Sequence, residues 1–106
     1  MRLLASREWQ LRHSIDLDQC EMLQIAGDSM HPTLPDGSEI LVDRSRRHLE
    51  CCRIYAFRTA TRVIVKRLDL RGGAWFLVSD NTRYPTLPLH PFFRLIGEVR
   101  WSSRVL

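Results

Sequence analysis

Short apolar segments separated by turn-forming residues recur along most of the chain, and this spacing limits the folds that the chain can adopt. Gly, Pro, Asn and Asp interrupt the apolar runs about every 8–12 residues, which is typical of β-strands joined by tight turns. The sequence also favours one short helix, which Ser6 caps and which ends near His13. Strands are expected at residues 21–26, 38–43, 53–58, 61–70, 74–79 and 93–101. The pattern therefore predicts a mainly β domain of small, strongly coiled sheets with one short N-terminal helix.

The segment between the first two expected strands holds a serine where turn-forming residues control the backbone closely. Gly27 can adopt dihedral angles that are closed to other residues, and two prolines and an Asp-Gly pair follow soon after it. Ser29 is therefore expected on a sharp bend, where the backbone N–H groups of Asp28 and Ser29 are free to bind an oxyanion. A serine hydroxyl is a weak nucleophile at neutral pH, so the bend gains catalytic meaning only with a base within hydrogen-bond reach.

Lys66 is the candidate base, and it is the only lysine among the 16 Lys and Arg residues of the chain. Strand alternation places it on one face between Ile64 and Leu68, and burial there would lower its pKa to about 7–8. Arginine could not serve, because it does not lose its proton. Each residue alone has a plainer explanation, since a serine beside a turn is usually a turn residue and a lysine on an apolar strand usually reaches water. We expect Ser29 and Lys66 to lie within hydrogen-bond distance, with Lys66 largely shielded from water.

Composition excludes several other classes of protein. The net charge of +4 permits contact with nucleic acid, but the arginines are scattered, so this part of the chain is not expected to bind DNA directly. The cysteines are Cys20, Cys51 and Cys52, an odd set with two adjacent members, which argues against a disulfide framework. The spacing of Cys and His is not that of a metal site, so no metal or cofactor is expected. No apolar run approaches the roughly 20 residues of a membrane span, and a cytoplasmic protein is expected.

The chain resembles the carboxy-terminal self-cleaving domain of LexA-like and phage-type repressors, peptidase family S24. The resemblance is carried by four strings in the same order: AGDSMHPTLPDGSEILVD, VIVKRL, SDNTRYPTL and IGEVRW. It covers nearly the whole chain, and it implies that Ser29 is the nucleophile and Lys66 the general base. Type I signal peptidases share the Ser-Met-x-Pro-Thr-Leu box and Ser–Lys chemistry, so the first string alone does not separate the two families.

The resemblance also implies how such a domain is used. It implies a serine peptidase of the Ser–Lys type that cleaves its own chain and relieves repression when a damage signal, as in the SOS response, promotes cleavage. The implied partners are a second copy in a homodimer, formed through the final strand at 93–101, the upstream segment as substrate, and a RecA-like co-activator filament. DNA would be bound only through a helix-turn-helix that this chain lacks, and no membrane partner is implied.

The expected cleavage site is not found in this chain. The family cuts an Ala-Gly or Cys-Gly bond well upstream of the nucleophile, whereas the sole such dipeptide here, Ala26-Gly27, is too close to reach the site. We therefore expect residues 1–106 to be a single domain and the carboxy-terminal part of a longer protein. Two alternatives stay open, a catalytically silent dimerisation module and, less favoured, a signal-peptidase-like enzyme. A further departure is Glu50-Cys51-Cys52-Arg53, where the family commonly has an Asp-Gly turn.

Overall fold

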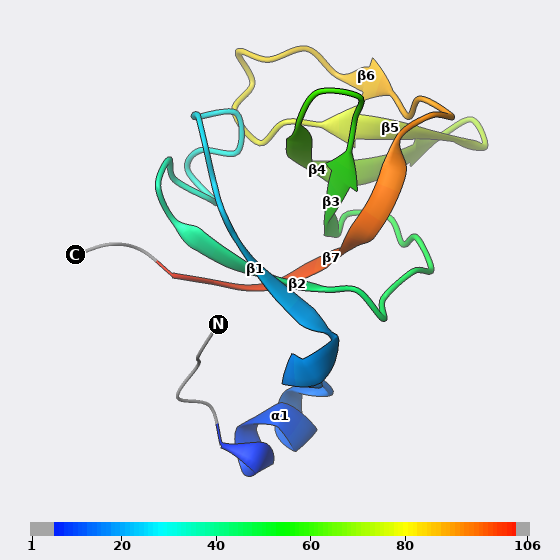
Figure 1. Ribbon diagram of the computed structural model, residues 1–106. Helices are drawn as coiled ribbons and strands as arrows, with labels where there is room; N and C mark the ends of the chain where they lie inside the picture. The colour runs from blue at the N-terminus through cyan, green and yellow to red at the C-terminus, as the bar shows by residue number, and fades with distance from the viewer. Residues whose placement is uncertain (1–5, 104–106) are drawn as a thin grey trace.

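The computed structural model describes residues 6–103, which form one antiparallel sheet of seven strands with a short helix at its N-terminal end (Figure 1). The predicted mainly β fold with one short N-terminal α-helix is confirmed, and the strands join in a single sheet. In chain order the elements are α1 (Arg7–His13), the 3-10 helix η1 (Leu17–Gln19), β1 (Cys20–Gln24), β2 (Glu39–Asp43), β3 (Ile54–Arg58), β4 (Val63–Arg71), β5 (Ala74–Val78), β6 (Leu87–Pro88) and β7 (Arg94–Ser103).

The sheet has the order β1-β2-β7-β3-β4-β5-β6, so β7 lies at its centre. Residues 98–103 of β7 pair with β2, and residues 94–98 pair with β3. The register shifts once in each pairing, and such bulges bend a strand and increase its twist. In Figure 1, β7 (orange to red) accordingly runs from the upper part of the molecule, near β3 to β6, down to the middle, where it crosses the region of β1 and β2. The final strand is thus a central strand that joins two halves of the sheet.

Close contact at this centre requires one glycine. A Cβ atom built on Gly97 would overlap the backbone carbonyl oxygen of Asp43 at the end of β2. Backbone cannot move aside as the tip of a flexible side chain can, so a larger residue would push β7 away from β2. Gly97 therefore allows the close approach of these two strands.

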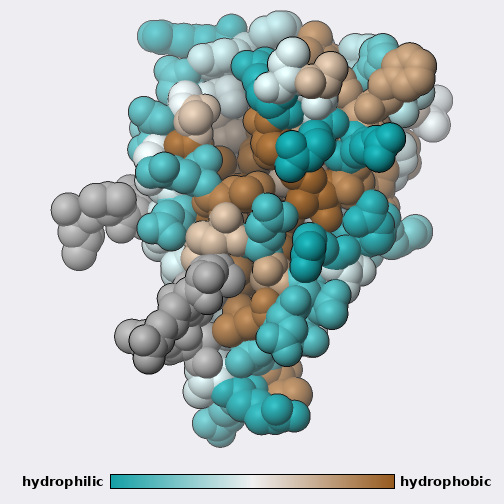
Figure 2. Space-filling model, in the orientation of Figure 1, coloured by the Kyte–Doolittle hydropathy of each residue, from teal (hydrophilic) through white to brown (hydrophobic). Residues whose placement is uncertain are grey.

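Buried side chains form two clusters, one on each side of β3. Tyr55 and Phe57 belong to one cluster and Ala56 to the other, because successive side chains of a strand point to opposite faces. The cluster around Ala56 includes Met30 and Leu34, which follow Ser29 in the segment between β1 and β2. Burying side chains of this size stabilises a fold by about 1.5–3 kcal/mol each, so this segment is anchored beside the serine. On the face seen in Figure 2, apolar surface (brown) remains visible between polar side chains (teal).

The helix α1 has the ends that the sequence predicts. The hydroxyl of Ser6 accepts a hydrogen bond from the backbone N–H of Trp9 at 3.0 Å, which caps the first turn. At the other end, Arg100 and Arg46 donate to the carbonyl groups of His13 and Ser14. The helix lies at the far end of β1 from the Ser29 bend (Figure 1). Within residues 6–103, no helix is long and apolar enough to cross a bilayer.

Candidate active site

A cleft of about 600 Å³ opens beside the segment that follows β1. Its walls come from residues 23–30, from residues 59–66 at the start of β4, from the end of β5 and from residues of the 84–93 segment. Ser29 and Lys66 both line this cleft, although they belong to different halves of the sheet. The structure thus brings the two predicted catalytic residues to the same cavity.

The bend that carries Ser29 has the shape expected from its turn-forming residues. Gly27 adopts φ +92°, in the region that favours glycine, and its backbone N–H donates to the Asp36 carboxylate at 2.8 Å. Turns follow at once, since the N–H of His31 donates to the carbonyl of Asp28 at 3.1 Å. Within the described part of the chain, no protein group accepts a hydrogen bond from the backbone N–H of Asp28 or of Ser29. These two donors are therefore available to a bound oxyanion.

Lys66 lies half-buried in β4, and its surroundings lower the pKa of its amine. Burial lowers the pKa of Lys66 below its ordinary value of 10.5, and the positive charge of Arg62 lowers it further. The ring of Tyr84 covers the amine, with its centroid 5.6 Å from Nζ. The amine is thus partly shielded from water.

The hydrogen-bond partner of Lys66 differs from the expectation. Among the described residues, Nζ donates to the hydroxyl of Ser79 at 2.8 Å, and no hydrogen bond joins it to Ser29. Ser79 is only 5% exposed and directly follows β5, where it also lines the cleft. The pairing of β4 with β5 explains this contact, because Arg67 faces Val78 and Lys66 therefore faces Ser79 on the neighbouring strand.

Sequence reasoning missed Ser79, although the sequence held a signal for it. Gly72 and Gly73 both have positive φ, at 57° and 80°, as a two-residue type I′ hairpin requires. Such a loop fixes the register of the two strands, because Arg71 must then pair with Ala74. Each step back along β4 then pairs with one step forward along β5, so Leu70 faces Trp75. Counting back along both strands from this loop places Lys66 opposite Ser79.

A second missed feature is the loop at residues 79–84, which holds the serine bend from the other side of the cleft. The backbone N–H of Asn81 donates to the carbonyl of Ser29 at 3.0 Å, and its side-chain amide donates to the carbonyl of Asp28 at 3.0 Å. The hydroxyl of Tyr84 donates to the carboxylate of Asp28. These bonds use the acceptors of the bend and leave its two N–H donors free. The 79–84 loop therefore fixes the orientation of the bend.

Asp80 connects this loop to the two segments that carry Ser29 and Lys66. Its carboxylate accepts two hydrogen bonds from Arg67, at 2.9 and 2.8 Å, and one from the Thr33 hydroxyl at 2.5 Å. The bond from Arg67 holds the pKa of Asp80 below its usual range, so the carboxylate is ionised at neutral pH. Arg67 follows Lys66 in β4, and Thr33 lies in the bend after Ser29. One carboxylate thus ties the strand of the lysine to the segment of the serine.

Comparisons with known proteins find one family and two curated proteins that resemble this chain. A family described as "Peptidase S24-like" matches residues 5–100, a range that contains Ser29, Lys66 and Ser79. A protein of Haemophilus influenzae named "Uncharacterized HTH-type transcriptional regulator" is 33% identical over 76 residues, which cover 71% of this chain and 32% of that protein. The "26 kDa repressor protein" of Escherichia phage HK022 is 33% identical over 67 residues, 63% of this chain and 28% of that protein. This chain spans about a third of the length of these relatives. On the match over residues 5–100, the chain belongs to the Peptidase S24-like family.

Proposed function

We propose that this chain is the carboxy-terminal self-cleaving domain of a LexA-like or phage-type transcriptional repressor, and that Ser29 and Lys66 are its catalytic pair. The observation that carries the proposal is the cleft itself, where a serine on a fixed bend and a half-buried lysine of lowered pKa line the same cavity. Membership of the family and the similarity to two regulators support this assignment.

In the proposed reaction, the neutral amine of Lys66 removes the proton of the Ser29 hydroxyl. Ser29 Oγ then attacks the carbonyl carbon of the scissile bond, and the N–H groups of Asp28 and Ser29 stabilise the oxyanion. Protonated Lys66 gives its proton to the leaving amine, and water hydrolyses the resulting ester. Ser79 is a positioning residue in this scheme, because a neutral amine can accept the Ser29 proton while it donates a hydrogen to Ser79.

The proposed substrate is an extended segment of the longer polypeptide that contains an Ala-Gly or Cys-Gly bond. Residues 63–65 of β4 pair with β3 on one side, whereas the pairing with β5 begins only at Arg67. Their second edge therefore has free backbone groups beside Lys66, and it can bind an extended peptide as an added strand. The apolar residues Leu23, Ile25, Val63 and Val65 line the same cleft and suit an apolar segment.

We also propose a homodimer, for which β7 offers a specific surface. Its pairing with β3 ends at Glu98, so among residues 6–103 only β2 pairs with residues 99–103. The opposite edge of these residues has free backbone donors and acceptors, to which the same edge of a second copy can pair with two-fold symmetry. DNA would be bound through a helix-turn-helix elsewhere in the longer protein, and a RecA-like filament would promote cleavage.

A serine-reactive fluorophosphonate tests the catalytic pair on the 106-residue chain itself. The probe forms a bond between phosphorus and Ser29 Oγ as fluoride leaves, and mass spectrometry identifies the labelled residue. We expect Ser29→Ala to remove the label and Lys66→Arg to slow labelling about 100-fold or more, because arginine cannot act as the base. Ser102→Ala, at an exposed position on β7, is the matched control and should label like the wild type.

Ser79 has its own set of variants in the same assay. Ser79→Ala should slow labelling and shift its pH profile, whereas Ser79→Thr should restore both, because threonine keeps the hydroxyl that Lys66 contacts. A wild-type chain that takes no label, together with a longer parent protein that does not cleave at any pH, would favour the silent dimerisation module. A Lys66→Arg variant that labels at the wild-type rate would remove Lys66 as the base.

A further inference from the structure

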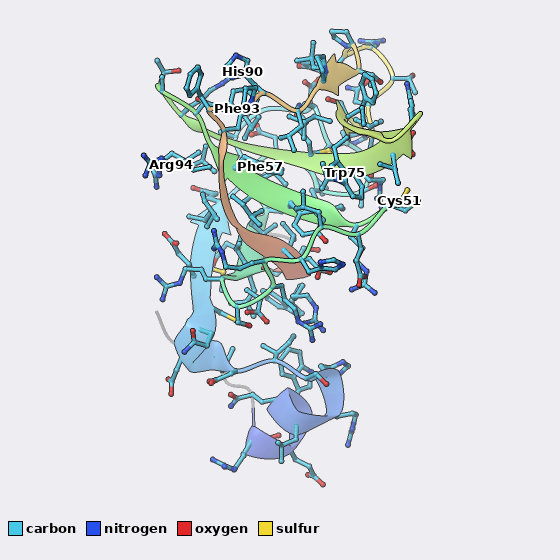
Figure 3. All side chains as sticks on the ribbon, turned by 90° about the vertical axis from the view of Figure 1, so that its right-hand side faces the viewer. Cys51, Phe57, Trp75, His90, Phe93 and Arg94 are labelled. Atoms are coloured by element: carbon cyan, nitrogen blue, oxygen red, sulfur yellow. The ribbon has the colours of Figure 1, made fainter. Side chains whose placement is uncertain are left out.

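Two adjacent cysteines lie in the turn that leads into β3, outside the candidate active site. The sulfur atoms of Cys51 and Cys52 are 3.2 Å apart, and both side chains are exposed. Figure 3 shows Cys51 at the edge of the molecule, at the opposite end of the strands from Arg94. Cys52 has φ +76°, in the region where a residue with a side chain is strained. Two accessible thiols are thus held side by side in a turn of unusual backbone conformation.

This turn is bonded to the network that holds the serine bend. The carbonyl of Cys52 accepts a hydrogen bond from Nη1 of Arg67 at 2.6 Å. The same guanidinium donates twice to Asp80, which also accepts from Thr33 in the bend. The carbonyl of Cys52 therefore helps to set the position of Arg67, and Arg67 sets the position of Asp80.

We propose that Cys51 and Cys52 are a redox-sensitive dithiol, which a small-molecule disulfide closes to a vicinal disulfide, and that closure loosens the hold of Arg67 on the serine bend. In the first step, the thiolate of one cysteine attacks the small-molecule disulfide, which gives a mixed disulfide and one released thiol. In the second step, the neighbouring cysteine attacks the protein sulfur of the mixed disulfide and releases the second thiol. The two cysteines are oxidised to one S–S bond, the small molecule is reduced to two thiols, and these carry away the two protons.

The ring that closure forms explains why the change reaches Arg67. The ring contains the N–Cα bond of Cys52, so drawing the two sulfur atoms from 3.2 Å to the length of an S–S bond constrains the φ angle of this residue. Rotation about that bond moves the carbonyl carbon and oxygen of Cys52, which is the group that accepts from Arg67. Closure therefore acts directly on the group that accepts the 2.6 Å hydrogen bond from Arg67.

Cys20 is an internal reference for this chemistry. It lies in β1 away from the turn, and burial, with a contribution from Asp43, raises its pKa to about 11. A thiol of this pKa is almost wholly protonated near neutral pH and reacts slowly with disulfides. The hydrogen bond with Cys52 also raises the pKa of Cys51, so the exchange is best followed at about pH 8.5, the ordinary pKa of a free cysteine.

The test treats the reduced 106-residue chain with oxidised glutathione and measures the intact mass after an acid quench. We expect the loss of two hydrogen atoms, no retained glutathione, and a link between Cys51 and Cys52 in the peptide map. Cys51→Ser and Cys52→Ser should each retain one glutathione, because the second attack is lost. Cys20→Ser is the control and should close like the wild type. A wild-type chain that retains glutathione, or that links Cys20 to either partner, would overturn the proposal.

Amide hydrogen exchange tests the connection to the bend and does not depend on any cleavage activity. The amides of His31 and Asn81, which donate to the carbonyls of Asp28 and Ser29, should exchange about threefold or more faster after closure, which is within the range of measured couplings between sites. Reduction with dithiothreitol should restore the slow rate. Closure with unchanged exchange in these residues would overturn the proposed effect on the bend, whatever the outcome of the labelling of Ser29.

Discussion

Replacing Asp80 with asparagine should destabilise the domain, and the structure gives the size of the effect. Asparagine keeps one oxygen for Arg67 but presents an N–H₂ group where the second guanidinium bond was accepted, so one charge-assisted bond is lost. A hydrogen bond to a charged group contributes roughly 1.5–3 kcal/mol. The Arg67 side chain is 34% exposed and Asp80 13%, so water screens part of this interaction. We expect the free energy of unfolding to fall by about 2 kcal/mol at pH 7.

Thermal and urea unfolding followed by tryptophan fluorescence measure this loss. A change of this size should lower the Tm of a domain of this length by about 10 °C. Asp69→Asn is the matched control, because Asp69 also pairs with an arginine two residues away but at the surface, at 2.7 Å from Arg71. A surface pair of this kind contributes little, so Asp69→Asn should leave the Tm almost unchanged.

The pH dependence separates this explanation from a general packing defect. The hydrogen bond from Arg67 lowers the pKa of Asp80 in the folded state, so its contribution is present above the unfolded pKa of about 3.9 and is lost as the pH falls through the folded value. The difference in Tm between wild type and Asp80→Asn should therefore be constant near neutrality and shrink in acid below about pH 4. Equal stability of the two proteins at pH 7, or a difference that stays constant in acid, would refute the reasoning.

Three other outcomes can be measured directly. Labelling of Ser29 should rise with pH and level off below the ordinary lysine pKa of 10.5, because burial lowers the pKa of Lys66; a rate independent of pH would exclude Lys66 as the base. Gly97→Ala should cost about 1–3 kcal/mol of stability, because its Cβ overlaps the Asp43 carbonyl; urea unfolding at the wild-type midpoint would contradict this. Sedimentation should show a homodimer, and monomer alone at high micromolar concentration would count against pairing through β7.

Local sequence signals predicted most strands, while the arrangement of the strands needed the structure. Alternating apolar residues placed β3 and β5 to within one residue, and Ser6 marked the start of α1 correctly. The two-residue strand β6 lies within an expected loop, because a segment so short and rich in proline has no periodicity to detect. The central place of β7 depends on pairing with β2 and β3, whose paired residues lie 36 to 64 positions earlier in the chain. Local patterns hold no information about such distant pairs.

Some residues of the candidate site could likewise be predicted from the sequence, and others could not. Ser29 and Lys66 could be chosen from the sequence, because one lies among turn residues and the other interrupts an apolar strand. The partner of Lys66 could also have been found by counting from the Gly72-Gly73 hairpin. The contacts of Asp80 could not have been found in this way. Its carboxylate accepts a hydrogen bond from Thr33, which is 47 residues away, and an aspartate that follows a strand usually faces water. Side-chain contacts between distant loops arise only when the sheet has closed.

The central position of β7 has a consequence for the order in which the ribosome makes the chain. The half of the sheet with Ser29 and the half with Lys66 are both complete before residues 94–103 are synthesised, yet no backbone pairing joins β2 to β3 without β7 between them. A nascent chain that ends before Arg94 therefore contains Ser29 and Lys66 but has no continuous sheet to align them. If self-cleavage is the function, the order of the strands prevents cleavage during translation. A protein truncated by a stop codon before β7 should therefore not cleave itself.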